Sequence, residues 1–267
     1  MTVAGNLRRG WLRGGWSDFL TAVQFLTRVR VPAQPYDADA LSRAVKFFPA
    51  VGLLIGLGSA LLYFLLTPHL PVAIVALLVV TYLVAITGCF HEDGLADVAD
   101  GFGGGWEREQ VLTIMRDSRI GSYGAAALAL SLLARVLLIA SLPENQAEFY
   151  LVAAPVLSRW TTLPLSFYLP PARHRDENQA DGKGEGQGAR IARLTTRGGL
   201  IFGSIFTVLV VLALLRLSGI LPILVSVGVT LLAALYYNHR IGGITGDCFG
   251  ATNQLAEIAV YLCGVWM

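Results

Sequence analysis

A short run of acidic residues is the clearest chemical signal in the sequence. Asp93, Asp97 and Asp100 stand at positions i, i+4 and i+7, and on a helix this spacing places their side chains on one face. Carboxylates so close together repel one another, whereas a divalent cation between them removes the repulsion. Mg²⁺ suits such oxygens, because it takes a few protein carboxylates and keeps room for water and substrate phosphates. The cluster therefore predicts a magnesium site that serves phosphate chemistry.

The neighbours of the three aspartates extend this cluster. Glu92 is a further candidate metal ligand, and His91 is a candidate to take a proton. Two alternatives stay open: the acids belong to a helix end that points into water, or they mark a cation path in a transporter. A glycine-rich run at 101–105 follows. It permits close approach to a ligand, or it is a flexible linker.

Two arginines three residues apart form the second signal. Arg116 and Arg119 can point to the same side, and each planar guanidinium matches phosphate oxygens. The alternative is a pair of arginines that only marks the cytoplasmic side of a membrane. The whole motif predicts substrate-binding positions at Arg116, Asp117, Ser118, Arg119, Gly121 and Tyr123.

An arginine inside an apolar stretch is costly in a membrane and usually faces a polar cavity or a partner. Arg159 is such a residue. We expect a phosphate or a carboxylate beside it, and the alternative is a structural ion pair with a neighbouring helix. Arg135 and Arg216 are interpreted as less functional, and Arg216 is close enough to a span end to snorkel.

The last chemical motif is a glycine-rich stretch at 242–254. Its glycines allow close packing between helices, and Asp247 and Asn253 supply oxygens at the depth of the acidic cluster. Asp247 is therefore a predicted metal ligand and Asn253 a predicted substrate contact. The alternative for Asp247 or Thr252 is a helix cap.

The elements that position these residues are apolar blocks. Only 14% of the residues are charged and the mean hydropathy is +0.61, whereas a soluble domain has about 25% charged residues. Several blocks approach the ~20 residues that cross a bilayer core. The sequence therefore predicts one all-α polytopic membrane domain, 1–267, with about seven transmembrane helices. The predicted spans are 47–66, 71–90, 121–141, 149–169, 200–217, 220–237 and 252–266.

The placement of positive charge predicts the orientation. Every Lys or Arg outside the predicted spans lies before the first span or in the connections after the second, fourth and sixth. This asymmetry places the segment 1–46, the loop 170–199 and the candidate active site in the cytoplasm. Within the first segment, Trp16, Phe19, Leu20 and Val23 recur at helical spacing, which predicts an amphipathic helix in the membrane interface.

Other features exclude some functions. The loop 170–199 is polar and glycine-rich and is expected to be mobile. Its GKGEGQG run lacks the order of a nucleotide-binding P-loop, and no nucleic-acid partner is expected. Cys89, Cys248 and Cys263 are interpreted as buried apolar residues rather than a disulfide framework. No removable signal peptide is expected at the N-terminus.

Five motifs together point to one family. They are FLTR at 25–28 with Val31-Pro32, FFP at 47–49 with Val51-Gly52, HEDGLAD at 91–97 with Asp100-Gly101, RDSRIG at 116–121 with Tyr123-Gly124, and GGITGD at 242–247 with Asn253 and Glu257. From about Phe19 to the C-terminus the chain resembles bacterial cobalamin synthase, the adenosylcobinamide-GDP ribazoletransferase family. A partial likeness to CDP-alcohol phosphotransferases, in DVADG at 97–101, lacks that family's downstream residues.

The resemblance implies an integral enzyme of the bacterial inner membrane that acts late in cobalamin biosynthesis and depends on Mg²⁺. It implies transfer from adenosylcobinamide-GDP to α-ribazole, or to α-ribazole 5′-phosphate, with release of GMP. A homo-oligomer or a pathway complex is compatible with this. A CDP-alcohol phosphotransferase of lipid synthesis and a cation-coupled transporter are the alternatives. The transporter is disfavoured because the acids gather at one face and no paired halves are visible.

The expected mechanism assigns a role to each motif. One or two Mg²⁺ lie against the substrate diphosphate, the arginines neutralise its remaining charge, and an acidic side chain or His91 takes the proton of the attacking ribose hydroxyl. The candidate metal ligands are Glu92, Asp93, Asp97, Asp100 and Asp247, and the candidate phosphate ligands are Arg116, Arg119 and Arg159.

Overall fold

A computed structural model of the chain describes residues 3–32, 39–172 and 195–267, with side chains from residue 14 onward. The described residues form helices and no strand, apart from one isolated parallel bridge between Pro171 and Ile244. In chain order the elements are α1 Val3–Leu26, α2 Ala40–Ala44, η1 Val45–Phe47, α3 Phe48–Leu66, α4 Val72–Thr87, α5 Phe90–Gly104, α6 Arg108–Ile114, α7 Ser122–Ala140, α8 Ala147–Trp160, α9 Thr162–Tyr168, α11 Arg197–Leu215, η2 Arg216–Gly219, α12 Ile220–Ile241 and α13 Gly246–Trp266.

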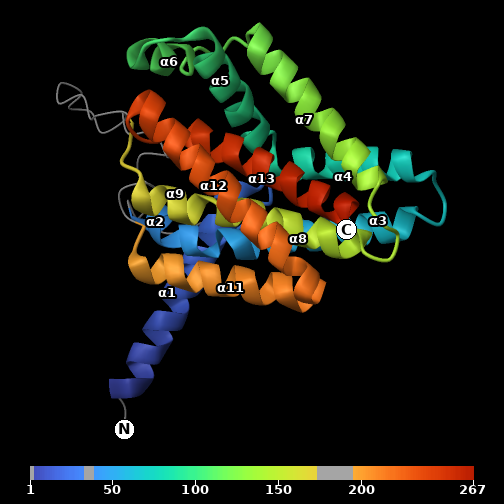
Figure 1. Cartoon of the computed structure of the whole chain (residues 1–267). Coiled ribbons are helices and arrows are strands. Elements are labelled where there is room, and N and C mark those ends of the chain that lie inside the picture. The colour runs from blue at the N-terminus through green and yellow to red at the C-terminus, as the bar shows by residue number, and fades with distance from the viewer. Residues whose placement is uncertain (1–2, 33–38, 173–194) are drawn as a thin grey trace.

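Two helices form the centre of the bundle. The helices α8 and α13 pack against each other, and nearly every residue of α8 is buried (Figure 1). Helix α3 covers α8, α5 and α7 cover α13, and α11 and α12 pack on the other flanks of the central pair. Polar side chains on α8 and α13 therefore lie inside the bundle rather than at its surface.

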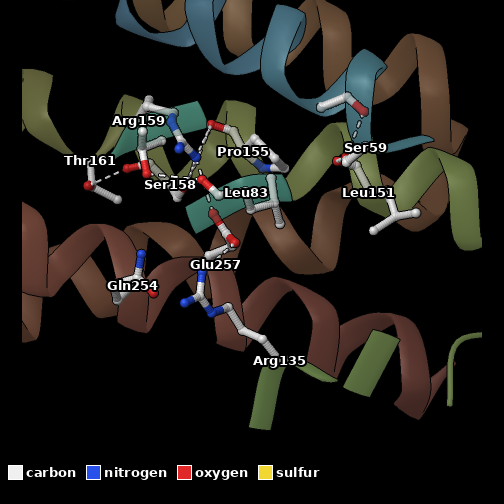
Figure 2. A network of polar contacts seen from close by, with 12 residues as sticks. Ser59, Leu83, Arg135, Leu151, Pro155, Ser158, Arg159, Thr161, Gln254 and Glu257 are labelled. Atoms are coloured by element: carbon white, nitrogen blue, oxygen red, sulfur yellow. Dashed lines mark hydrogen bonds and ion pairs between the residues drawn. The ribbon is translucent and has the colours of Figure 1, made fainter. Parts of the chain in front are cut away.

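The backbones of α3 and α8 approach closely. A side chain at Gly52 or Gly56 would overlap the backbone of α8, so only glycine fits at these two positions. Pro155 lies inside α8 and has no N–H to bond the carbonyl one turn earlier, on Leu151. The hydroxyl of Ser59 on α3 lies 3.1 Å from that carbonyl oxygen (Figure 2) and 2.8 Å from the carbonyl oxygen of Gly56, and shares its one proton between them. The proline and the serine thus form a matched pair across the two helices.

A sharp bend separates α4 from α5. The two helices meet at 89°, and both Gly88 and Cys89 adopt left-handed backbone conformations there, with φ of 66° and 62°. The second predicted span, 71–90, therefore ends earlier than expected. Cys89 is exposed, so the prediction that all three cysteines are buried is wrong for it, whereas Cys248 and Cys263 are buried.

The fourth predicted span, 149–169, is two helices rather than one. Helix α8 ends at Trp160 and α9 begins at Thr162. Pro164 has no N–H to continue the ladder to the carbonyl of Trp160, and the hydroxyl of Thr161 bonds back to Ser158 at 2.6 Å. Arg159 is consequently in the last turn of a helix rather than in the middle of a span.

Three segments of the described chain are long and apolar enough to cross a membrane, namely Ala40–Leu66, Ser122–Ala140 and Arg197–Ile241, and the bent pair of α4 and α5 raises this to four if it forms one span. The third segment contains both α11 and α12, and α12 turns back from the end of α11 (Figure 1). These findings agree with the predicted class, an all-α membrane protein. The number of seven spans stays a prediction.

The N-terminal segment is helical up to Leu26, as its spacing predicts. Asp18 holds it to the following turns through ion pairs with Arg43 at 3.3 Å and Lys46 at 3.0 Å. Trp16 is exposed and Val23 is buried in the core. The position of this N-terminal helix in a membrane interface stays a prediction. Most of the loop 170–199, including the GKGEGQG run, lies outside the described residues.

Candidate active site

The carboxylates of α5 lie in different environments. Asp93 is exposed and Asp97 is half-buried, so one stretch of the helix presents acidic groups toward the outside. Glu92 and Asp100 are buried, with exposed fractions of 3% and 9%. The helix predicted from the i, i+4, i+7 spacing is present, but the three aspartates do not share one degree of exposure.

Helix α13 brings the C-terminal motif to the same part of α5. It begins six residues before the predicted span, because the hydroxyl of Thr245 caps it by accepting from the Cys248 N–H at 3.4 Å. Neither Asp247 nor Thr252 is the cap. A Cβ at Gly94 would lie 2.8 Å from the Asp247 carbonyl oxygen, so the glycine lets Asp247 lie directly against α5, between the turns of Asp93 and Asp97.

This donor set fits Mg²⁺ only in part. Within the described residues, no group of three or more His, Cys, Asp or Glu side chains is placed to hold a metal ion by itself. Asp93, Asp97 and Asp247 are nevertheless carboxylates on adjoining backbone segments, with Asp93 exposed. Mg²⁺ in phosphate-transferring sites is commonly bound by one or two carboxylates together with the substrate phosphates. The arrangement fits an ion that the protein and a diphosphate hold jointly.

A chain of four buried charges crosses the bundle centre, and Figure 2 shows three of them, Arg135, Glu257 and Arg159. Arg135 on α7 donates to Glu92 on α5 at 2.8 Å and lies 3.6 Å from Glu257 on α13. Glu257 accepts in turn from Arg159 on α8 at 3.1 Å. All four are at most 3% exposed, and they alternate in sign with no net charge. Gln254 adds a weaker contact to Glu92 at 3.4 Å.

These pairs link four helices through residues that are at least 43 positions apart in the sequence. Buried charges are tolerated only when paired, and here each charge has a partner on a different helix. Arg159 therefore forms a structural ion pair with Glu257 on a neighbouring helix. This was the alternative to a phosphate partner in the sequence analysis. Glu92 is engaged by Arg135 and is not directed at a shared metal position. The sequence does not single out Arg135, although its place within an apolar span was an available signal.

The arginine motif forms an exposed loop between α6 and α7. Arg116, Ser118 and Arg119 are exposed. Asp117 pairs with Arg119 through both carboxylate oxygens, the shorter contact being 2.6 Å. Hydrogen bonds from this guanidinium lower the pKa of Asp117 to about 2. The loop thus presents positive charge, part of which Asp117 already neutralises.

Asp100 joins this loop to α5. Its carboxylate accepts from the Gly121 N–H at 2.7 Å and from the Gly124 N–H at 2.8 Å. Both donors are in the first turn of α7, where backbone N–H groups have no helical partner. The motif at 116–124 is therefore held to the acidic helix at its C-terminal end.

The glycine run 101–105 is the last turn of α5 rather than a linker. A Cβ at Gly101 would overlap the side chain of Met115, and one at Gly103 would lie 2.6 Å from the ring of Tyr123. The run therefore lets α6 and the start of α7 pack on α5. Tyr123 itself is 56% exposed above Gly103.

Two further arginines, which the sequence analysis does not predict as site residues, bind the ends of neighbouring helices and turns. Arg108 donates to the carbonyls of Ile241 at 2.9 Å and Ala172 at 2.6 Å. Arg240 donates to the carbonyl of Gly105 at 2.8 Å. These groups are the unpaired carbonyls of helix ends or turns. Arg108 is the first residue of α6 and Arg240 is one residue before the end of α12, and an arginine at a helix end is too common a pattern to predict such a contact.

His91 and Asn253, predicted as a catalytic and a substrate-binding residue, are both buried. Their exposed fractions are 4% and 1%. They lie on α5 and α13, whose backbones meet where Gly250 approaches the backbone of His91. The structure therefore separates an accessible set, with Asp93, Asp97, Arg116 and Arg119, from a buried set that includes these two residues.

Comparison with known proteins decides the family. The family model for cobalamin-5-phosphate synthase matches residues 18–265. The chain belongs to this family. A relative from Shewanella sp. (strain W3-18-1), named adenosylcobinamide-GDP ribazoletransferase, is 38% identical over 91% of this chain and 92% of its own length. Relatives of the same name from Shewanella frigidimarina and Azorhizobium caulinodans are 40% and 42% identical, over 97% and 93% of this chain and 97% and 95% of their own lengths. No solved structure matches the chain significantly.

Membership of the cobalamin-5-phosphate synthase family confirms the resemblance drawn from the five motifs. The matched region contains every accessible and buried residue of the candidate site. It also contains the four-charge network and the Asp100 contact, which the motifs do not predict. The family assignment therefore applies to the whole site rather than to one motif.

Proposed function

We propose that the chain is a Mg²⁺-dependent transferase that joins adenosylcobinamide-GDP to α-ribazole, or to α-ribazole 5′-phosphate, and releases GMP. The observation that carries this is the arrangement along α5, where Asp93 and Asp97 flank the point at which the Asp247 backbone packs against Gly94, and the arginine loop is attached one turn further on. Asp93 and Asp100 are about 10 Å apart along the helix, at 1.5 Å per residue.

The names of the relatives supply the substrates of the proposal. Each of the three is called an adenosylcobinamide-GDP ribazoletransferase and matches nearly the full chain. Their name pairs adenosylcobinamide-GDP with a ribazole group, and in the proposed reaction the diphosphate of the first substrate is broken at one phosphorus. Accessible carboxylates beside accessible arginines are the residue types that such a displacement needs.

The chain's own residues take the following roles. Asp93 and Asp97, with Asp247, would hold Mg²⁺, which when bound neutralises charge on the diphosphate oxygens. Arg116 and Arg119 bind the remaining phosphate oxygens with their guanidinium groups. Asp117, beside Arg119, orients that guanidinium.

The bond changes are those of a phosphoryl displacement. The ribose hydroxyl oxygen of the ribazole bonds to the phosphorus on the cobinamide side. The bond from that phosphorus to the bridging oxygen breaks, and its electron pair leaves with GMP. The hydroxyl proton passes to a carboxylate of the accessible pair, since His91 is buried.

The buried residues support this site from inside. We assign Glu92, Arg135, Arg159 and Glu257 to holding α5, α7, α8 and α13 in register, because their charges are paired with one another. Asn253 lies in the same central helix as Glu257 and is equally buried. These residues act on the reaction through the position of α5 and α13.

The proposed setting is a bacterial inner membrane, crossed about seven times, with the N-terminus and the active site in the cytoplasm. The broad apolar faces of α3, α4, α11 and α12 support contact with a lipid bilayer, since residues such as Phe64, Ile74, Leu209 and Leu232 are exposed. The clustering of Lys and Arg in alternate connections supports the orientation. Reporter fusions at each connection test both.

The test of the reaction uses purified protein in liposomes. It receives adenosylcobinamide-GDP, α-ribazole and Mg²⁺, and chromatography follows cobalamin and GMP, with EDTA as the metal control and Asp93→Asn as the matched variant. We expect both products from the wild type only with Mg²⁺, and neither from the variant. If the protein instead forms products from CDP-activated alcohols, the proposal is contradicted.

A further inference from the structure

The contact between Asp100 and the start of α7 explains two motifs at once. Asp100 is 9% exposed, and its two oxygens accept separately from the Gly121 and Gly124 N–H groups. A carboxylate at a helix N-terminus is stabilised by the unpaired N–H groups and by the positive end of the helix dipole. Asp100, the last acidic residue of the motif, is therefore already hydrogen-bonded to the backbone at the start of α7.

The two glycines are needed for this contact. A Cβ built on Gly121 or on Gly124 would overlap the Asp100 carboxylate, closer than real Cβ atoms approach any group. At Gly124 it would also lie 2.9 Å from the carbonyl oxygen of Ala96. The Gly-x-x-Gly spacing therefore forms a recess in the surface of α7 that the carboxylate fills.

The loop between these points carries the exposed arginines. Met115, at the end of α6, lies over Gly101 on α5, and Gly121 is bonded to Asp100. Both ends of the segment 116–120 are therefore attached to the last two turns of α5. The position of Arg116 and Arg119 relative to Asp93 and Asp97 depends on these two attachments.

We propose that Asp100 is a positioning residue, whose carboxylate fixes the arginine loop against α5, and that it does not serve as a metal ligand. This inference rests on the proposed function in one respect, namely that Arg116 and Arg119 bind phosphate oxygens. The contact itself does not depend on that function. Asp100 differs in this from Asp93, which is exposed on the same helix.

Hydrogen–deuterium exchange followed by mass spectrometry tests the contact without any substrate. In Asp100→Asn the side chain keeps one acceptor oxygen and gains an NH₂ that faces an N–H donor. We expect exchange in the peptide covering 116–125 to speed up by about tenfold or more, while peptides from α3 and α8 stay unchanged. Asp93→Asn is the matched control and should leave 116–125 unchanged. Unchanged exchange in Asp100→Asn overturns the proposal.

A double-mutant cycle tests the recess. Gly121→Ala should reduce turnover by about tenfold, because its Cβ displaces the carboxylate of Asp100 and meets no other group so closely. In an Asp100→Ala background, which has no carboxylate to displace, the same change should cost less than about twofold. Additive losses overturn the assigned contact, and the result is independent of whether Asp100 binds a metal.

The dependence of turnover on Mg²⁺ separates positioning from ligation. We expect Asp100→Asn to lower kcat or raise KM for adenosylcobinamide-GDP, with the half-saturating Mg²⁺ concentration unchanged within about twofold. A metal ligand would shift that concentration by about tenfold or more. If the wild type has no such activity, the proposed function fails, whereas the exchange result for the contact still stands or falls by itself.

Discussion

Glu92 and Asp93 are neighbours in the sequence, yet the first is buried among arginines and the second is exposed. The same contrast recurs two turns later, where Asp97 is half-buried and Asp100 is bonded to two backbone N–H groups. One helix therefore carries two kinds of carboxylate. Glu92 and Asp100 hold helices together, and we propose that the more exposed Asp93 and Asp97 bind the metal ion.

The largest effect is expected from the buried network. Glu257→Gln leaves the guanidinium groups of Arg135 and Arg159 buried beside a neutral partner. Removing one member of a buried ion pair costs about 3 to 5 kcal/mol, so the free energy of unfolding in detergent should fall by this amount. Glu109→Gln is the control, because Glu109 pairs with Arg108 at the surface with 79% of its side chain exposed, and it should cost less than about 1 kcal/mol. Equal losses would remove the distinction between the buried and exposed pairs.

The accessible carboxylates should affect activity instead. Asp93→Ala and Asp97→Ala should each lower turnover by about 100-fold or more, because bound metal contributes several kcal/mol of charge stabilisation. The unfolding midpoint of Asp93→Ala should stay within a few degrees of the wild type, since Asp93 is exposed. Activity and thermal unfolding are measured on the same preparations. Full activity in both variants would exclude these residues from the site.

The packing of α5 on α13 allows a finer test. Gly94→Ala introduces a Cβ 2.8 Å from the Asp247 carbonyl oxygen, which pushes Asp247 away from the accessible pair. We expect turnover to fall by about tenfold, as displacements near 1 Å can do at a catalytic site. Gly228→Ala on α12 is the control, because a Cβ there meets nothing within 4 Å. Equal activity of the two variants would separate Asp247 from the site.

The smallest effect concerns the exposed pair of Asp117 and Arg119. Arg119 lowers the pKa of Asp117 from 3.8 to about 2, so the carboxylate is stabilised in the folded state. Its contribution to stability is complete above about pH 4 and is lost as the pH falls toward 2. Asp117→Asn should therefore lower the unfolding midpoint slightly at pH 7, and the difference from wild type should shrink as the pH falls and vanish below about pH 2. A difference that grows on acidification would contradict the sign.

Local sequence patterns were sufficient for much of the helical framework. Apolar blocks predicted helices at 47–66 and 121–141 that the structure has within two residues, because their length and composition depend on no distant contact. The same patterns could not predict the bend at Gly88 and Cys89. A left-handed conformation at a cysteine is set by tertiary packing and has no local signature.

The site was predicted only as far as residue type and spacing allow. The i, i+4, i+7 spacing correctly predicted a helix for the aspartates. It could not predict that Asp100 meets Gly121 and Gly124, or that Glu92 meets Arg135, since these contacts join segments more than 20 residues apart. Which carboxylates are accessible is therefore a property of the fold rather than of the motif.

Binding of Mn²⁺, a paramagnetic substitute for Mg²⁺, tests the division between the two kinds of carboxylate most directly. Electron paramagnetic resonance measures bound Mn²⁺ in the presence of adenosylcobinamide-GDP for the wild type and for Asp93→Asn, Asp97→Asn, Asp100→Asn and Glu92→Gln. The account predicts that the first two variants lose the bound ion and that folded Asp100→Asn and Glu92→Gln retain it. Loss of the ion in Asp100→Asn with retention in Asp93→Asn would contradict it.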